Sequence, residues 1–330
     1  MTLDPRGSIL DIRDLHVSFR TSGSPVTVLN GVTFQVARGE VLALLGESGS
    51  GKSVTAAATM GLIEQPPGSI DRGAILFDGV NLLGLSPADH RRLCGERLSL
   101  VFQDALAALN PVYPVGWQIA EVFRIHGRAD RKTAALESIK LMEAVGIPAA
   151  AERAGHYPHQ FSGGMCQRIM IAMAIALQPE LIIADEPTTA LDVTIQAQIV
   201  ELLKALRART GASLVLITHD LGLVAELADR VVVMYGGRVV EEAGVHDIFA
   251  RPLHPYTQAL LASQPRMDRS NAELRPIRGI PPNPAAPLTG CAFHPRCPRA
   301  EARCAQEAPA DQMIAPGRRS ACHFAAEMLA

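Results

Sequence analysis

The most informative stretch of this chain reads Phe161-Ser162-Gly163-Gly164-Met165-Cys166-Gln167-Arg168. It opens an apolar, helix-like segment, and its glycines leave backbone N–H groups able to face a phosphate. Another Gly-rich stretch, Gly46 to Ser53, lies about 110 residues earlier, and the acidic pair Asp185-Glu186 comes later. One chain cannot apply both Gly-rich stretches to the same ATP. The pattern therefore indicates a particular class of ATPase, in which the two stretches serve different nucleotides.

Composition excludes several other classes. The chain has 330 residues with 31 Lys+Arg against 33 Asp+Glu, so nothing in its charge suggests a nucleic-acid partner. The longest apolar run, Ile169 to Leu177, is far shorter than the roughly 20 residues of a membrane span. Residues Met1 to Asp14 contain three Asp and lack the basic region and apolar core of a secretory signal. We expect a cytosolic protein with reduced thiols, whose membrane association needs a partner.

Short apolar runs alternate with helical patterns through the first two-thirds of the chain. Val41 to Leu45 predicts a buried parallel strand, and Lys52 to Met60 the helix after it. Further strands are expected at 98–102, 181–184, 213–217 and 230–235, and helices at 118–125, 131–145 and 164–177. The helical stretch between 104 and 177 indicates a helical subdomain inserted into an α/β sheet domain. From about Pro252, prolines and four of the six cysteines gather in a small extension.

The first Gly-rich stretch has the Walker A spacing G-x-x-x-x-G-K-S. Its glycines let the backbone wrap phosphates, Lys52 reaches the β- and γ-phosphates, and the Ser53 hydroxyl suits magnesium. The residues predicted to bind ATP here are Gly46, Glu47, Ser48, Gly49, Ser50, Gly51, Lys52 and Ser53. A chance Gly-rich turn is the alternative, and the flanking strand and helix disfavour it.

Residues 181–187, Leu-Ile-Ile-Ala-Asp-Glu-Pro, fit the Walker B pattern of an apolar strand that ends in two carboxylates. Asp185 is placed to support magnesium, and Glu186 to polarise the attacking water. Seen alone, two adjacent acids usually mark a polar turn. The strand before them and the Walker A loop favour catalysis.

From Ile9 to about Ala250, these stretches and their order resemble the ATP-binding cassette (ABC) proteins. The resemblance implies a P-loop ABC ATPase domain over residues 1–250. That fold has a parallel-sheet core, an antiparallel β subdomain and an inserted helical subdomain at about 104–177. It also implies that ATP lies between the Walker A loop of one subunit and Ser162, Gly163 and Gly164 of the facing subunit.

The same resemblance assigns further single residues. Gln103 resembles the Q-loop glutamine, which contacts magnesium and links the site to the transport subunit. His219 resembles the switch histidine that holds the γ-phosphate, and Ala190-Leu191-Asp192 resembles the D-loop. Phe19 is the candidate for stacking on adenine, with a core Phe as its rival. A lone Gln in a loop or His after a strand would otherwise mean little.

The branch of the family follows from what surrounds the cassette. There is one copy, without fused membrane helices or a long coiled coil. Arg251 to Leu260 and Gly290 to Pro298 resemble the C-terminal extension of bacterial dipeptide/oligopeptide permease ATPase subunits. Gly46 to Ser53, and Leu109-Asn110-Pro111 after the Q-loop, also resemble that subfamily. This implies a peptide importer at the cytoplasmic face of the bacterial plasma membrane. Its partners would be two transmembrane permeases, a second, non-identical ATPase and an extracytoplasmic solute-binding protein. Nickel, opine or another small solute, and a soluble non-transport ATPase, are the alternatives.

Four cysteines, Cys291, Cys297, Cys304 and Cys322, cluster in the extension at 251–330. In a reduced compartment such clustering favours a metal over disulfides. The spacing leaves zinc and iron-sulfur open. The resemblance implies a 4Fe-4S cluster, with zinc as the alternative, acting as a staple for a segment with little core of its own.

Three departures from the family pattern stand out. Cys166 follows Met165 where relatives commonly have Arg, Ala105 follows Asp104 where relatives usually have Pro, and Trp117 occupies a usually polar place. The last two predict an altered contact with the permease. Cys94 and Cys166 have no cysteine neighbours and are expected to be plain thiols.

Overall fold

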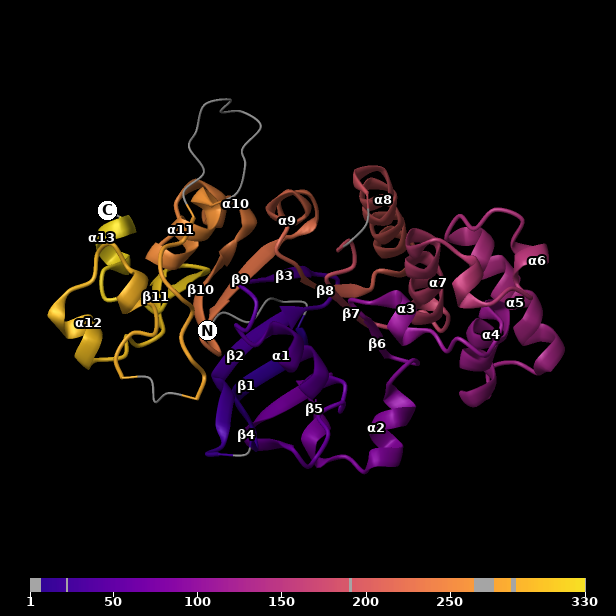
Figure 1. Ribbon diagram of the computed structural model, residues 1–330, viewed down its shortest axis with the longest axis horizontal. Coiled ribbons are helices and arrows are strands. Elements are labelled where there is room, and N and C mark those ends of the chain that lie inside the picture. The colour runs from indigo at the N-terminus through magenta and orange to yellow at the C-terminus, as the bar shows by residue number, and fades with distance from the viewer. Residues whose placement is uncertain (1–6, 22, 190–191, 264–275, 286–288, 330) are drawn as a thin grey trace. The chain divides into compact units, whose positions relative to one another are not determined.

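The computed structural model describes residues 7–21, 23–189, 192–263, 276–285 and 289–329 (Figure 1). The chain divides into two compact units. The first comprises Met1–Ile9, Ala37–Gly39 and Gly84–Ile217, and the second comprises Leu10–Val36, Glu40–Leu83 and Thr218–Ala330. The Walker A loop therefore belongs to the second unit. The Q-loop, the signature stretch and the Walker B strand belong to the first.

Three strands of the first unit lie side by side and parallel. They are β6 (Leu98–Val101), β7 (Leu181–Asp185) and β8 (Ser213–Ile217), with β7 in the middle. Every residue of β7 and β8 is buried, as expected of parallel strands that are covered on both faces. Helix α8 (Val193–Thr210) connects these two strands and ends at Gly211, which has the left-handed conformation common at helix ends. The predicted strands are confirmed to within a residue.

Helices fill the chain between β6 and β7. They are α3 (Ala105–Ala108), α4 (Val115–Ile125), α5 (Arg131–Ala144), α6 (Ala150–Arg153), the 3-10 turn η2 (Pro158–Gln160) and α7 (Gly163–Ile175). Helices α4 and α5 pack on each other and on α7 (Figure 1). Helices α5 and α7 begin at polar caps, since Asp130 accepts from the Thr133 N–H and Ser162 from the Met165 N–H. The helices expected between residues 104 and 177 are present, with bounds that differ by up to three residues. Helix α2 (Pro87–Leu93), which precedes β6, was not predicted.

The second unit contains a four-stranded antiparallel sheet in the order β2-β1-β4-β5. Its strands are β1 (Ser8–Phe19), β2 (Val26–Ala37), β4 (Gly68–Phe77) and β5 (Val80–Asn81), and η1 (Leu82–Gly84) follows. Apolar residues face each other across β1 and β4, for example Ile12 opposite Ile75 and Val17 opposite Ile70. The antiparallel β subdomain expected from the family resemblance is present.

A mixed sheet in the same unit carries the Walker A loop. Strand β3 (Val41–Leu45) lies parallel to β9 (Arg230–Tyr235), and the loop leads from β3 into α1 (Lys52–Thr59). Strand β10 (Arg238–Gly244) returns antiparallel to β9. Helix α9 (Leu221–Leu227) precedes β9, and α10 (Val245–Ala250) follows β10.

The C-terminal extension continues this sheet. Its elements are α11 (Pro255–Ala262), η3 (His294–Arg296), α12 (Ala302–Gln306), β11 (Gln312–Ala315), β12 (Arg318–Ser320) and α13 (Ala325–Leu329). Strand β12 pairs antiparallel with β10 and with β11. A small core beneath them contains Leu253, Cys304, Phe324, Ala325 and Met328. Strands of three and four residues give almost no periodic signal, so the sequence did not predict this hairpin.

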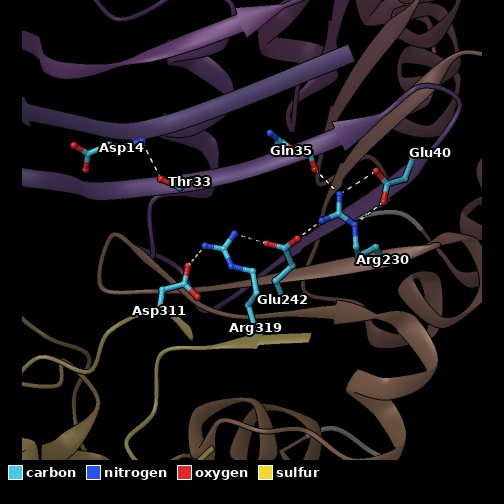
Figure 2. A network of polar contacts seen from close by, with 8 residues as sticks. All are labelled: Asp14, Thr33, Gln35, Glu40, Arg230, Glu242, Asp311 and Arg319. Atoms are coloured by element: carbon cyan, nitrogen blue, oxygen red, sulfur yellow. Dashed lines mark hydrogen bonds and ion pairs between the residues drawn. The ribbon is translucent and has the colours of Figure 1, made fainter. Parts of the chain in front are cut away.

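A polar network joins the hairpin to the rest of the unit (Figure 2). The Arg230 guanidinium binds the Glu40 carboxylate at 2.7 and 3.1 Å, the Glu242 carboxylate, and the Gln35 carbonyl at 2.5 Å. From β12, Arg319 reaches Glu242 at 3.7 Å and also pairs with Asp311. Burial raises the pKa of Glu242, and the charge of Arg230 opposes that rise. The extension is therefore tied to the sheet by charge as well as by strand pairing.

Candidate nucleotide site

The Walker A loop has the backbone its sequence requires. Gly46, Gly49 and Gly51 have φ angles of 150°, 79° and 104°, which disfavour residues with a side chain. A Cβ atom on Gly46 would also lie 2.3 Å from the Met234 carbonyl oxygen. The Lys52 Nζ atom donates to the carbonyls of Gly46 at 2.7 Å and Glu47 at 3.0 Å. The ammonium group is therefore held inside the curve of the loop, where a β- or γ-phosphate would compete for it.

The outer side of this loop contacts residues that the sequence analysis did not single out. The Glu47 N–H donates to the Tyr256 hydroxyl at 2.7 Å, and the Glu47 carboxylate pairs with Arg296. Tyr256 lies in the Arg251 to Leu260 stretch that supported the family resemblance, which was the one available signal. Nothing in the sequence connected Arg296 with the loop.

In the first unit, adjacent strands bring Gln103 and Glu186 together. Gln103 follows β6, Glu186 follows β7, and the Gln103 Nε2 atom donates to the Glu186 carboxylate at 2.9 Å. The Thr189 hydroxyl donates to the same carboxylate oxygen at 2.9 Å, and sequence reasoning had missed it. Glu186 also has a left-handed φ of 47°, a strained conformation that is found disproportionately at functional sites. The carboxylate is thus aimed by a turn and by two donors. Asp185 is buried at the end of β7.

The signature stretch forms the N-terminus of α7, a helix of 13 residues. Ser162 is its N-cap, and Ser162 and Gly163 are exposed. A Cβ atom on Gly164 would lie 2.8 Å from Ile195 of α8, whereas one on Gly163 would meet no described atom within 4 Å. Packing inside the chain thus explains Gly164 but not Gly163. The exposed amides at the positive end of the helix dipole suit an anion.

Cys166, the departure within this stretch, is fully buried in α7. Its Sγ lies 3.5 Å from the Pro158 carbonyl oxygen, and burial raises the pKa of its thiol. Burial likewise raises the pKa of Cys94. Neither cysteine takes part in a disulfide, and a raised pKa lowers the share of reactive thiolate.

The remaining predicted residues lie at the ends of different elements. His219 is exposed between β8 and α9. Asp192 caps α8, where it accepts from the Ile195 N–H at 2.9 Å, while Ala190 and Leu191 of the D-loop lie outside the described residues. Phe19 is half-buried at the end of β1 against Gly68. The roles given to these residues stay predictions.

The four cysteines of the extension line one small cavity, together with Phe293, Phe324 and His254 among others. The Arg299 N–H donates to the Cys297 Sγ at 3.4 Å, and backbone N–H groups of residues 293 and 324 lower the pKa of Cys291 and Cys322. Burial has the larger effect on both thiols: it raises the pKa of Cys291, and it raises the pKa of Cys322 to about 11. No set of three or more His, Cys, Asp or Glu within the described ranges is placed to hold a metal ion. The 4Fe-4S cluster expected for these cysteines stays a prediction.

Two protein families match the chain. The ABC transporter family matches residues 29–189, and the C-terminal region of oligopeptide/dipeptide transporters matches residues 240–304. The dipeptide transport ATP-binding protein DppD of Escherichia coli is 47% identical over 317 residues, which cover 96% of this chain and 97% of that protein. The oligopeptide transport ATP-binding protein OppD of Bacillus subtilis is 50% identical, over 86% of this chain and 80% of that protein.

Solved structures agree at the level of the fold. A dimeric ATP-binding cassette in a post-hydrolysis state, bound to ADP and Pi, superposes with a TM-score of 0.65 at 24% identity, over 72% of this chain and 98% of that one. The cassette cbiO1 of Clostridium perfringens, part of the cbiONQ transporter complex, gives 0.62 at 27% identity, over 74% and 91%. Within the described ranges, no helix has the length and apolarity to cross a bilayer.

Proposed function

Because this chain belongs to the ATP-binding subunits of the dipeptide/oligopeptide permease family of ABC transporters, we propose that it is the ATP-hydrolysing motor of a peptide importer. The proposal that the chain hydrolyses ATP rests on one observation: the Glu186 carboxylate accepts hydrogen bonds from Gln103, which follows β6, and from Thr189, which follows β7. A carboxylate aimed in this way is suited to take a proton from water.

In the proposed reaction, the Walker A amides and Lys52 bind the β- and γ-phosphates of ATP. Ser53, Gln103 and Asp185 are oxygen donors of the kind magnesium prefers, and they would hold the ion that neutralises the phosphate charge. Glu186 orients the attacking water and accepts its proton, and His219 holds the γ-phosphate. Phe19 stacks on the adenine.

The facing subunit completes the site through Ser162, Gly163 and Gly164, with Asp192 beside them in the interface. Support comes from the exposed N-terminus of α7 and from the open space around Gly163. Binding of ATP then closes two subunits around two nucleotides, and hydrolysis lets them part. A second, non-identical ATPase is the proposed facing subunit.

An exposed apolar surface just after the Q-loop is the proposed contact with the permease. It comprises Phe102, Leu106, Val112, Tyr113 and Trp117. The Tyr113 and Trp117 rings stack with centroids 4.3 Å apart. The Gln118 amide fixes the loop from Asn110 to Tyr113 by hydrogen bonds to the backbone of both residues. Five exposed apolar side chains within 16 positions of the chain are what an interface of this kind would supply. The subunit would thus lie at the cytoplasmic face of the inner membrane, on two transmembrane permeases served by a solute-binding protein.

For the extension we propose a 4Fe-4S cluster, with zinc as the alternative. Cys291, Cys297, Cys304 and Cys322 would hold it, since they already line one cavity and backbone N–H groups face several of their sulfurs. A donor set of four thiolates fits either metal. The cluster would act as a structural cross-link of the extension. Iron and acid-labile sulfide in anaerobically purified protein support iron-sulfur, and stoichiometric zinc supports the alternative.

The experiment that tests the function is purification of the tagged chain from gently solubilised native membranes. Two polytopic permeases, a second ATPase and a solute-binding protein are expected to accompany it. Trp117→Gln should reduce the recovery of permeases, while Ile125→Gln, an exposed control on the same helix, should not. Uptake of labelled dipeptides and uptake of nickel, measured on the same transporter, then show which solute it imports. Recovery without any membrane chain would instead favour a soluble, non-transport ATPase.

A further inference from the structure

The C-terminal extension supplies a buried arginine to the Walker A loop. The Arg296 guanidinium makes a two-pronged ion pair with the Glu47 carboxylate, at 2.6 Å from Nη1 and 3.0 Å from Nη2. The Arg296 side chain is only 4% exposed and that of Glu47 is 26% exposed, so the pair is partly shielded from water and salt. The hydrogen bonds that Arg296 donates to the Glu47 carboxylate raise the pKa of Arg296.

Two tyrosines complete the contact. The Tyr256 hydroxyl accepts the Glu47 N–H at 2.7 Å, and the Tyr235 hydroxyl lies 3.2 Å from Arg296. Their rings are fully buried, with centroids 4.5 Å apart, and both pack on Phe293 of the extension. An aromatic cluster of this kind has little freedom to move. The groups that meet Glu47 are therefore held in fixed positions.

Lys52 and the extension both bind the Gly46-Glu47 segment of the loop. Lys52 binds the carbonyls of Gly46 and Glu47 from within, and Tyr256 and Arg296 bind the amide and carboxylate of Glu47 from without. The direction of the Gly46–Glu47 peptide therefore depends on the extension. The position of the Lys52 ammonium group depends on that peptide in turn.

We propose that Arg296 and Tyr256 are positioning residues of the nucleotide site, through which the extension sets the affinity of the Walker A loop for nucleotide. The inference rests on the proposed binding of ATP by residues 46–53. Neither side chain contacts the reacting atoms, so the effect falls on binding rather than on the chemical step. The loop binds the β-phosphate as well, so ADP and ATP are affected alike.

Fluorescent ADP binding to the full chain, and the KM and kcat for ATP of the assembled transporter, test this. Arg296→Gln and Glu47→Gln are each expected to raise the ADP Kd and the KM about tenfold, within the usual range of coupling between sites, with kcat nearly unchanged. The double variant should lose no more than either single variant, because both act through one pair. Arg296→Lys, which keeps the charge but not the fork, should restore part of the affinity.

Arg303→Gln is the matched control. Arg303 belongs to the same extension, lies 4.5 Å over the Phe324 ring and donates to the His323 carbonyl, away from the loop. It is expected to lower thermal stability but to leave nucleotide affinity unchanged.

Three results would overturn the inference: wild-type affinity in folded Arg296→Gln and Glu47→Gln, an equal loss of affinity in Arg303→Gln, or additive losses in the double variant. Failure of the wild-type chain to bind ADP would instead overturn the proposed function.

Discussion

The Glu186 side chain is fixed by a strained backbone and two donors, which suits a group that must meet a water molecule in one orientation. Glu186→Gln keeps the size and the hydrogen-bonding oxygen but cannot accept a proton. We expect kcat to fall by a factor of about 100 to 10,000, the usual range for losing a general base. ATP binding should survive, so the variant should accumulate as a closed, ATP-bound dimer. Steady-state hydrolysis and nucleotide content measure the two effects.

Glu180→Gln provides a matched control for that substitution. Glu180 immediately precedes the same strand and pairs with Arg38 and Arg97. The control should cost some stability and leave hydrolysis intact. Undiminished turnover in Glu186→Gln would remove this residue from the role of base.

Glu241 and His254 form a second instructive pair, buried where the extension begins. The Glu241 carboxylate accepts the N–H groups of Leu253 and His254, and the His254 ring accepts the Tyr256 N–H. Burial raises the pKa of Glu241 from 4.5 to about 7 and lowers that of His254 from 6.5 to about 3. Between pH 4.5 and 6.5 the folded chain holds the Glu241 proton and the unfolded chain holds the histidine proton. Their contributions to the pH dependence of stability therefore cancel.

Replacing either residue should reveal the pH dependence of stability that the other one causes. In Glu241→Gln only His254 remains, so the free energy of unfolding should rise with pH by up to about 1.4 kcal/mol per unit across that window. In His254→Asn only Glu241 remains, and stability should fall with pH by a similar amount. Urea unfolding at a series of pH values measures both slopes. Parallel curves for the two variants and the wild-type chain would contradict the assignment.

The N-terminus of α7 separates packing from function at neighbouring glycines. Gly164→Ala must displace Ile195 and is expected to cost about 1–3 kcal/mol of stability. Gly163→Ala meets nothing within the described chain, so its unfolding free energy should be unchanged or slightly higher. If this position faces the nucleotide of the other subunit, Gly163→Ala should nevertheless reduce ATP hydrolysis by the transporter at least about tenfold. A fully active Gly163→Ala transporter would argue against the shared site.

The ion pairs that link strands β9, β10 and β12 are expected to contribute unequally to stability (Figure 2). Arg230→Met would leave Glu40 and Glu242, each about one-tenth exposed, without their main partner, at an expected cost of about 3 kcal/mol. Arg319 is 30% exposed, so Arg319→Met should cost less than about 1 kcal/mol. Urea denaturation of the two variants in parallel measures the difference, and equal losses would refute it.

For the whole molecule, the sequence predicted the parallel strands β3, β6, β7, β8 and β9 because buried strands such as β7 and β8 are short, continuous apolar runs. It also placed the motif residues at strand ends, and the Gln103–Glu186 contact follows from that placement. The hairpin β11–β12 and the contacts of Arg296 were not predictable. Three- and four-residue strands have no readable period, and a pairing across 249 positions leaves no local trace.

The ion pair between Glu47 and Arg296 also limits how this protein could be recombined. An extension moved onto a cassette whose loop lacks the acidic residue would bury a guanidinium with no counter-charge, and a cassette deprived of its extension would leave Glu47 and its amide without their outer partners. Cassette and extension are therefore expected to be inherited and exchanged as one piece. Across related chains, the residues at positions 47 and 296 should change together or not at all.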